Sequence, residues 1–278
     1  MNSRAVVWFL LVLGFFPYLR TFAADAFPVT VTVDTKASVR PVPPLLFGHN
    51  NEWTNSGDGF WNAATHSSEP QPTALARTVH PGLIRFPGGS LSNYYHWADG
   101  IGPVAKRPPG TNYTTVSSVN GQWTVNAKLQ PMVYGFDEHM RLVKALGAAG
   151  ALVTVNVTEY LGSPAWSGSA PEAAAWVAYA NARTDGPDVA LGKDAQGRDW
   201  HTRRYWARQR AANGHPAPYG VRYWEIGNEV DDRSQGAGLT GPTYAQRVHD
   251  YARAMRAVDP TVQIGAVLGM SWLPDILR

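Results

Sequence analysis

Residues 221–230, Val-Arg-Tyr-Trp-Glu-Ile-Gly-Asn-Glu-Val, constrain the fold more than any other part of this sequence. The first half carries the β-branched and aromatic residues that fit a buried strand. The second half ends in Gly-Asn-Glu and precedes a polar run that is typical of a loop. A strand with Asn228 and Glu229 at its carboxyl end is typical of parallel α/β barrels, where functional side chains gather at that end. Because side chains alternate along a strand, Glu225 and Glu229 are expected on one face.

The same pattern, an apolar run that ends in polar residues, recurs along the chain. Glu52 follows a first run, Ser90 a second and Asn156 a third. Apolar residues at helical spacing predict helices between these runs, over residues 72–80, 136–146, 171–181 and 244–258. A last strand is predicted over residues 262–268. Repeated strand–helix units imply a parallel sheet.

The predicted fold class is therefore α/β, a (β/α)₈ TIM-type barrel of which this chain supplies about five core strands. A doubly wound open sheet has the same alternation of strands and helices. However, no glycine-rich dinucleotide fingerprint follows the first predicted strand, which disfavours that alternative.

Two segments between the strands carry further predictions. Arg85 lies inside an apolar run, and an unpaired buried charge is costly, so we expect a carboxylate partner in the barrel mouth. Residues 107–130 read as a long loop with a β-hairpin around Asn120-Gly121. Residues 183–219 are polar and contain Gly and Pro, and no helix or strand is predicted there.

Composition excludes several functions. The 24 Lys and Arg residues are spread along the chain and give a net charge of only +3, so nucleic-acid binding is not indicated. Cysteine is absent, which excludes disulfides and thiolate chemistry. The eight His residues lie far apart without metal-ligand spacing, so neither a metal nor a cofactor is expected. The 11 Trp and 12 Tyr residues suit stacking on sugar rings, and equally suit a core.

The amino terminus has the pattern of a secretory signal peptide. Arg4 precedes a continuous apolar run over residues 5–16, and Thr21-Phe-Ala23 has small residues suited to cleavage before residue 24. The predicted organisation is a signal peptide at 1–23, a strand segment and linker at 24–44, and a partial barrel at 45–278. We expect a secreted or periplasmic protein without a membrane anchor after cleavage. An uncleaved anchor is the alternative.

The pairing of an acid with an amide at a strand exit suggests a specific chemistry. Glu229 is suited to general acid catalysis on a glycosidic oxygen, and Asn228 to hydrogen bonding with a sugar hydroxyl. Taken alone, a single Glu in this setting would more often be a solvated loop residue.

Several segments together resemble the α-L-arabinofuranosidases of glycoside hydrolase family 51. They are Gly48-His-Asn-Asn-Glu52, Arg85-Phe-Pro-Gly-Gly-Ser90, Trp97-Ala-Asp-Gly-Ile-Gly-Pro103 and the segment from Tyr223 to Glu229. The resemblance extends from about residue 45 to residue 278. It implies a retaining glycosidase with a (β/α)₈ barrel.

Carried over by position, the resemblance assigns roles to the residues that follow the predicted strands. Glu229 would be the general acid/base and Asn228 a partner of the sugar 2-hydroxyl. Glu52 would bind substrate, and Arg85 would lie below the nucleophile. Two further substrate-binding candidates are Ser90, which replaces an Asn of the family, and Trp97.

The family's nucleophile has no counterpart in this sequence. A retaining mechanism needs two carboxyl groups about 5–5.5 Å apart, and no Glu follows Glu229. Glu52 and Glu225 do not occupy the nucleophile position, and Glu225 is expected to point into the barrel and pair with Arg85 or with solvent-bridged groups. The sequence is therefore predicted to be an N-terminal fragment of a longer enzyme, catalytically incomplete alone.

The expected function is a secreted retaining glycoside hydrolase that acts on plant polysaccharide side chains, with α-L-arabinofuranosidase as the expected activity. Its partner would be an oligo- or polysaccharide, and the sequence carries no sign of an oligomeric state. One alternative is a non-catalytic carbohydrate-binding protein. The other is a related barrel glycosidase of the endoglucanase or xylosidase type.

Overall fold

The computed structural model describes residues 30–32, 34, 36, 41–109, 112–119, 122–128, 131–158, 167–232, 239–269 and 271–277. The chain divides into two units, residues 1–41 and residues 42–278. The predicted signal peptide lies outside the described residues. Residues 30–32, within the strand segment predicted at 24–44, have no regular secondary structure.

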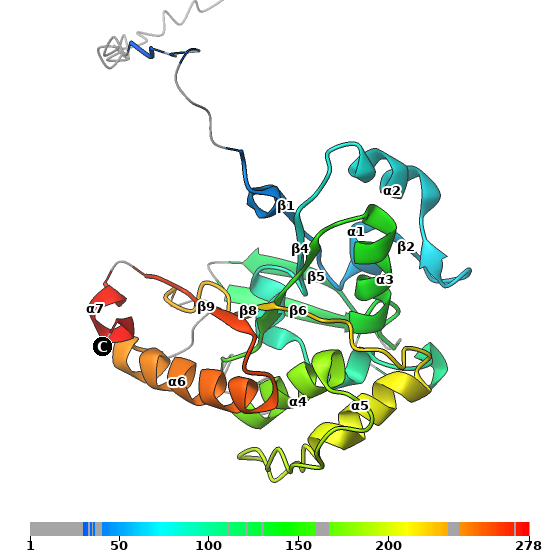
Figure 1. The fold of residues 1–278 in the computed structure, drawn as a ribbon, viewed down its shortest axis with the longest axis vertical. Coiled ribbons are helices and arrows are strands. Elements are labelled where there is room, and N and C mark those ends of the chain that lie inside the picture. The colour runs from blue at the N-terminus through cyan, green and yellow to red at the C-terminus, as the bar shows by residue number, and fades with distance from the viewer. Residues whose placement is uncertain are drawn as a thin grey trace, which may run out of the picture. The chain divides into compact units, whose positions relative to one another are not determined.

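The second unit is built on a parallel five-stranded sheet. Its strands are β1 (Gly48–Asn50), β4 (Leu83–Phe86), β7 (Gly150–Val155), β8 (Tyr223–Ile226) and β9 (Gln263–Ala266). They lie side by side in the order of the chain, and every neighbouring pair is parallel. This sequential order is that of consecutive strands in a (β/α)₈ barrel, and it confirms the predicted fold class over five strands (Figure 1).

Helices connect these strands. They are α2 (Pro70–Arg77), α3 (Phe136–Leu146), α4 (Ala170–Asn181), α5 (Arg203–Ala212), α6 (Gly241–Val258) and α7 (Leu273–Ile276). Four of them confirm the helices predicted from hydrophobic spacing. Helices α4, α5 and α6 each begin at a side-chain cap. The hydroxyl oxygens of Ser169, Thr202 and Thr240 accept a backbone N–H of the first turn. None of the helices in the described ranges has the length and apolar character to cross a membrane.

Helix α5 lies within residues 183–219, where the sequence analysis predicted no helix. Its sequence, Arg-Arg-Tyr-Trp-Ala-Arg-Gln-Arg-Ala-Ala, shows little apolar periodicity, and only Trp206, Ala207 and Arg210 are buried. The buried Arg210 side chain donates to the carbonyl oxygens of Tyr179 and Ala182, at the end of α4. A charged residue thus takes an inward position that a hydrophobic pattern does not reveal.

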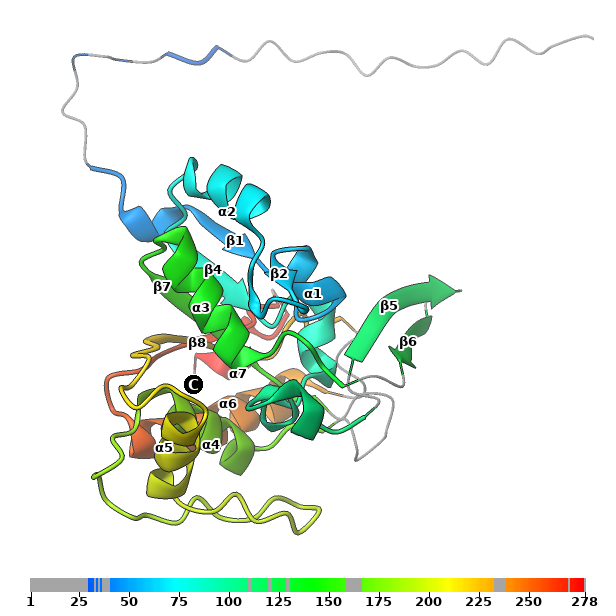
Figure 2. The same cartoon turned by 90° about the vertical axis from the view of Figure 1, so that its right-hand side faces the viewer.

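Short elements surround the sheet. The antiparallel pair β2 (Trp61–Asn62) and β3 (Ser67–Ser68) follows the left-handed turn α1 (Asn55–Asp58), and four 3₁₀ helices lie at Pro44–Leu46, Ser90–Tyr94, Trp97–Gly100 and Val104–Lys106. Strands β5 (Asn112–Val119) and β6 (Gln122–Lys128) pair antiparallel from Val119 opposite Gln122, which confirms the predicted hairpin. Figure 2 shows this hairpin projecting away from the sheet.

The two faces of the sheet differ in burial. Strands β4 and β8 both alternate between half-buried and fully buried residues. Phe86 and Trp224 are on the buried face, where each packs edge-on against Trp176 of α4. Arg85 and Glu225 are on the opposite, half-buried face. The apolar core therefore lies between sheet and helices, and the inner face carries the charged pair Arg85 and Glu225 beside half-buried Leu152 and Tyr223.

Candidate active site

An ion pair crosses the inner face of the sheet. The Nε of Arg85 on β4 lies 2.6 Å from a carboxylate oxygen of Glu225 on β8. Thr154 of the intervening strand β7 donates to the same oxygen at 2.9 Å. Both charged side chains keep part of their surface accessible, at 22% and 30%. The prediction that Arg85 needs a carboxylate partner, and that Glu225 supplies it, is confirmed.

The remaining donors of Arg85 hold the ends of three strands together. They reach the side-chain oxygen of Asn50 at 3.2 Å, the carbonyl oxygen of Gly88 at 2.8 Å and the side-chain oxygen of Asn228 at 3.0 Å. A guanidinium group suits this task because it presents five donors in a fixed planar arrangement. Arg85 thereby orients Asn228 through the amide oxygen.

Glu229 is exposed at the end of β8, beside Asn228. The Asn228 amide nitrogen lies 3.4 Å from a Glu229 carboxylate oxygen. Glu229 has a φ of 46°, in the left-handed region that costs a non-glycine residue roughly 1–2 kcal/mol. Gly227 before it has a φ of 78°, and a Cβ there would lie only 2.5 Å from Val157. The backbone thus turns sharply at the strand exit and directs the Glu229 carboxylate towards solvent.

Asn93 is a site residue that the sequence analysis missed. Its side chain is fully buried and donates to the carbonyl oxygen of Asn228 at 3.1 Å. The hydroxyl of Thr158, after β7, donates in turn to the carbonyl oxygen of Asn93 at 3.2 Å. Asn93 therefore ties the loops after β4, β7 and β8 together and fixes the peptide that leads into Glu229. Its position in an aromatic run gave no sequence signal for this contact.

Glu52 lies at the exit of β1 and faces the glycine turn after β4. A Cβ on Gly88 would lie 2.8 Å from the Glu52 Cγ, so only glycine leaves room for this side chain. Partial burial, and then the negative charge of Asp58, raises the pKa of Glu52 above its ordinary value. A contact from the Thr54 hydroxyl, at 3.5 Å, opposes this rise. Because Gly88 also accepts from Arg85, which in turn binds Asn50 and Asn228, the exits of β1, β4 and β8 meet around one turn.

The other predicted substrate-binding residues have different surroundings. Ser90 is half-buried at the start of the 3₁₀ helix that follows Gly89. Trp97 is only 1% exposed, and its indole packs against Trp176 and Trp206. Its Nε1 donates to the backbone oxygen of Glu172 at 3.1 Å. Trp97 is therefore a core residue, and the expectation that it contacts substrate does not match its position.

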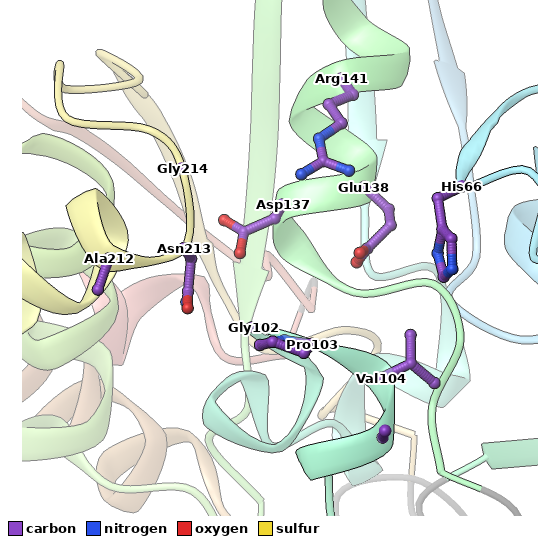
Figure 3. Close-up of a pocket in the computed structure, with 11 residues that line it drawn as sticks. His66, Gly102, Pro103, Val104, Asp137, Glu138, Arg141, Ala212, Asn213 and Gly214 are labelled. Carbon is purple, nitrogen blue, oxygen red and sulfur yellow. The ribbon is translucent and has the colours of Figure 1, made fainter.

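A separate cavity of about 760 Å³ lies at the start of α3 (Figure 3). Its lining includes Asp137, Glu138 and Arg141 of α3, together with Asn213 at the end of α5. Asp137 accepts from the hydroxyls of Tyr179 and Tyr219, and Glu138 pairs with Arg107, so both carboxylates are satisfied internally. The strand-exit residues Glu52, Arg85, Asn228 and Glu229 are not part of this lining.

The strand-exit arrangement can bind a polyol and exchange a proton with it. Asn228 and Glu52 offer hydrogen-bonding groups on the half-buried inner face, and Glu229 offers an exposed carboxyl group. The parts of the chain that the structure describes contain no cluster of three or more His, Asp or Glu side chains suited to a metal ion. Proton transfer and hydrogen bonding are therefore the chemistry that these side chains can supply themselves.

Comparisons with known proteins give a family model and curated relatives that match this chain. The family model described as "Alpha-L-arabinofuranosidase 1 domain" matches residues 75–272. "Alpha-L-arabinofuranosidase C" of Emericella nidulans is 29% identical over 182 residues, which are 66% of this chain and 29% of the relative. The "Intracellular exo-alpha-(1->5)-L-arabinofuranosidase 1" of Bacillus subtilis is 24% identical over 193 residues, 69% of this chain and 31% of the relative.

Solved structures match over most of the described fold. An arabinose complex of the α-L-arabinofuranosidase from Thermotoga maritima superposes with a TM-score of 0.65 and 25% identity, covering 87% of this chain and 44% of that one. The thermostable GH51 α-L-arabinofuranosidase from Thermotoga petrophila superposes with a TM-score of 0.63 and 25% sequence identity, covering 86% of this chain and 44% of that one. The matched region thus spans less than half of each relative. With its family model covering most of its length, this chain belongs to the alpha-L-arabinofuranosidase 1 domain family.

Proposed function

We propose that the protein containing this chain hydrolyses α-L-arabinofuranosides, with Glu229 as the general acid/base. The observation that carries the proposal is the exposed Glu229 carboxyl group at the end of β8, next to an Asn228 side chain that Arg85 holds at 3.0 Å. An acid at this place can protonate the departing glycosidic oxygen, while the Asn228 amide bonds a sugar hydroxyl. The printed names of the relatives support an arabinofuranoside as the substrate.

Glu52, Arg85 and Ser90 complete the proposed sugar site. Glu52 would bind substrate hydroxyls from the exit of β1, and Ser90 would do so from the start of the 3₁₀ helix after β4. Glu225 already accepts from Arg85 and Thr154, at 2.6 Å and 2.9 Å, which suits a residue that supports the site from below. We propose that a carboxylate other than Glu225 and Glu52 forms the glycosyl-enzyme.

The remaining parts of the proposal concern the setting of the enzyme. The apolar run near the amino terminus and the small residues before residue 24 support export from the cell. The substrate would then be the arabinofuranosyl side chains of plant polysaccharides outside the cell. Measuring the mature amino terminus of the secreted protein tests this part, and a chain that retains residues 1–23 in the cell would contradict it.

The decisive experiment compares substrates with good and poor leaving groups. In the protein containing this chain, Glu229→Ala should lower kcat/KM for an arabino-oligosaccharide about 10²–10⁴-fold more than for an activated aryl arabinofuranoside, because only the former needs a proton on its leaving oxygen. Asp185→Asn, at an exposed ion pair remote from the strand exits, is the control and should leave both values unchanged.

Equal losses for the two substrates would exclude the acid role of Glu229. A protein that binds arabinofuranosides through Glu52 but shows no turnover would instead be a carbohydrate-binding protein. Calorimetric titration of the wild-type protein and Glu52→Gln with arabinofuranosides separates binding from turnover.

A further inference from the structure

The turn that follows Glu52 has an unusual left-handed backbone. Asn55, Ser56, Gly57 and Asp58 have φ values of 49°, 57°, 63° and 53°, and Gly59 continues with 81°. The N–H groups of Gly57 and Asp58 both donate to the carbonyl oxygen of Thr54, and Gly59 donates to Asn55. A run of left-handed residues that includes Asn, Ser and Asp is disfavoured for L-amino acids, so contacts elsewhere must hold it.

The turn directs the Asp58 carboxylate back onto the residues before it. One oxygen accepts from the backbone N–H of Glu52 at 2.7 Å and from the side-chain amide of Asn51 at 3.3 Å. The same Asn51 amide also donates to the carbonyl oxygen of Gly57 at 2.9 Å. Asp58 is therefore hydrogen-bonded to the backbone N–H of Glu52 itself.

A buried aromatic residue holds the turn from the core side. Tyr134 is fully buried, and its hydroxyl donates to the Asn51 side chain at 2.7 Å. Its ring lies against Gly57, where a Cβ would be 2.8 Å from the ring atoms. The Tyr134 hydroxyl also lies 3.2 Å from the Nδ1 of the buried His139. Asn51 and the turn are therefore anchored to helix α3 and cannot shift without disturbing the core.

We propose that Asp58 is the positioning residue of Glu52, fixing its backbone and placing a second negative charge beside its carboxyl group. The role of Glu52 in sugar binding rests on the proposed function, whereas the positioning of Glu52 by Asp58 does not. The charged groups around Glu52 are Asp58 from the turn, and Arg85 from β4, which reaches this region through the Gly88 carbonyl. The raised pKa of Glu52, caused by burial and then by Asp58, is in accord with the geometry.

A protonated Glu52 could donate a hydrogen bond to a sugar oxygen, whereas an ionised one only accepts. Asp58 favours the protonated form, because a like charge nearby disfavours ionisation. The predicted consequence is that sugar binding through Glu52 changes as the pH passes through the Glu52 pKa, and that this change moves to lower pH when the Asp58 charge is removed.

The test uses the full chain and nuclear magnetic resonance. Carboxyl ¹³C titration gives the pKa of Glu52, and amide exchange of Glu52 reports its N–H bond. In Asp58→Asn the side-chain oxygen can still accept, so the Glu52 pKa should fall while its amide stays protected. In Asp58→Ala the Glu52 amide should exchange at least about tenfold faster, since an opening of that order corresponds to the loss of one hydrogen bond. Asp185→Asn should change neither quantity.

An unchanged Glu52 pKa in Asp58→Asn, or an unchanged Glu52 amide in Asp58→Ala, would overturn the proposal. The amide of Trp224 on β8 is the control for general unfolding. It should remain as protected from hydrogen exchange in both variants as in the wild type. Affinity for an aryl arabinofuranoside is then measured for the same variants and for Glu52→Gln. If Asp58 variants move the Glu52 signals but neither they nor Glu52→Gln alter sugar affinity, the positioning stands and the proposed sugar role of Glu52 fails.

Discussion

The Arg85 guanidinium and the Glu225 carboxylate meet at 2.6 Å although strand β7 separates their own strands. The pair therefore bridges three strands on the inner face of the sheet. Thr154 of β7 completes the bridge by donating to Glu225. Every strand-exit residue that Arg85 binds depends on this anchor, because the guanidinium can hold Asn228 and Gly88 only while Glu225 fixes its orientation.

The first prediction concerns this pair. Glu225→Gln removes the charge that Arg85 needs, and we expect the free energy of unfolding to fall by about 1–3 kcal/mol, the usual cost of leaving a partly buried charged group poorly paired. The exposed pair of Arg183 and Asp185 is the matched control, and Asp185→Asn should leave the free energy of unfolding essentially unchanged. Urea denaturation measures both. Equal effects would show that the inner pair behaves as a surface ion pair.

The left-handed backbone of Glu229 gives a second prediction. Asn adopts this conformation more readily than Glu or Ala. We therefore expect Glu229→Asn to be more stable than Glu229→Ala by about 0.5–1 kcal/mol, while both lack the carboxyl group. Thermal and urea unfolding of the two variants provide the comparison. If Glu229→Ala is as stable as Glu229→Asn, the strain at this position is not present in solution.

Asn93 should affect the site through Asn228. Asn93→Ala leaves the buried Asn228 carbonyl without this donor, and a loss of about 1–3 kcal/mol in the free energy of unfolding is expected. Because the peptide before Glu229 then gains freedom, turnover of arabinofuranosides by the protein containing this chain should fall as well.

Asn213→Ala is the control for Asn93. It removes an amide that donates to the Tyr179 hydroxyl at 2.9 Å, and Asn213 lines the cavity at the start of α3 rather than the strand exits. Stability should decrease in both variants, but turnover only in Asn93→Ala. Normal turnover in Asn93→Ala, measured where the protein is fully folded, would contradict the positioning role.

The buried His139 predicts a pH dependence of stability. Burial lowers the pKa of His139 from 6.5 to about 3. The unfolded chain therefore binds a proton on this residue below about pH 6.5, whereas the folded chain does not until about pH 3. Between these values the unfolded state holds more protons, so the free energy of unfolding falls as the pH decreases, by up to about 1.4 kcal/mol per unit from this residue.

His139→Phe isolates this contribution, since an aromatic ring can keep the stacking on Phe86. Its unfolding free energy should decline less steeply than that of the wild type between pH 6 and pH 4, which urea titrations at several pH values measure. Parallel slopes for His139→Phe and wild type would show that His139 is not buried in its neutral form.

Much of the fold could be predicted because it depends on local pattern. The helix at Phe136–Leu146 was predicted with its observed bounds, since apolar residues at helical spacing end at Gly147, which has a φ of 68°. Strand β8 was predicted from its aromatic and β-branched residues, and the ion pair of Arg85 from the cost of burying a lone charge. Helix α5 was missed because Arg210, rather than an apolar residue, fills its inward position.

The sequence by itself determined the order of the five core strands and of four helices, and the placing of Glu52, Asn228 and Glu229 at strand exits, because periodicity and turn residues act over a few neighbours. Only the tertiary structure decided that Trp97 is a core residue, that Asn93 holds the Asn228 carbonyl, and that Asp58 bonds the Glu52 peptide. These contacts join residues through the packing of separate segments or through a left-handed turn held by Tyr134. No local pattern encodes them, because the free energy that selects them comes from burial and hydrogen bonding between distant parts of the chain.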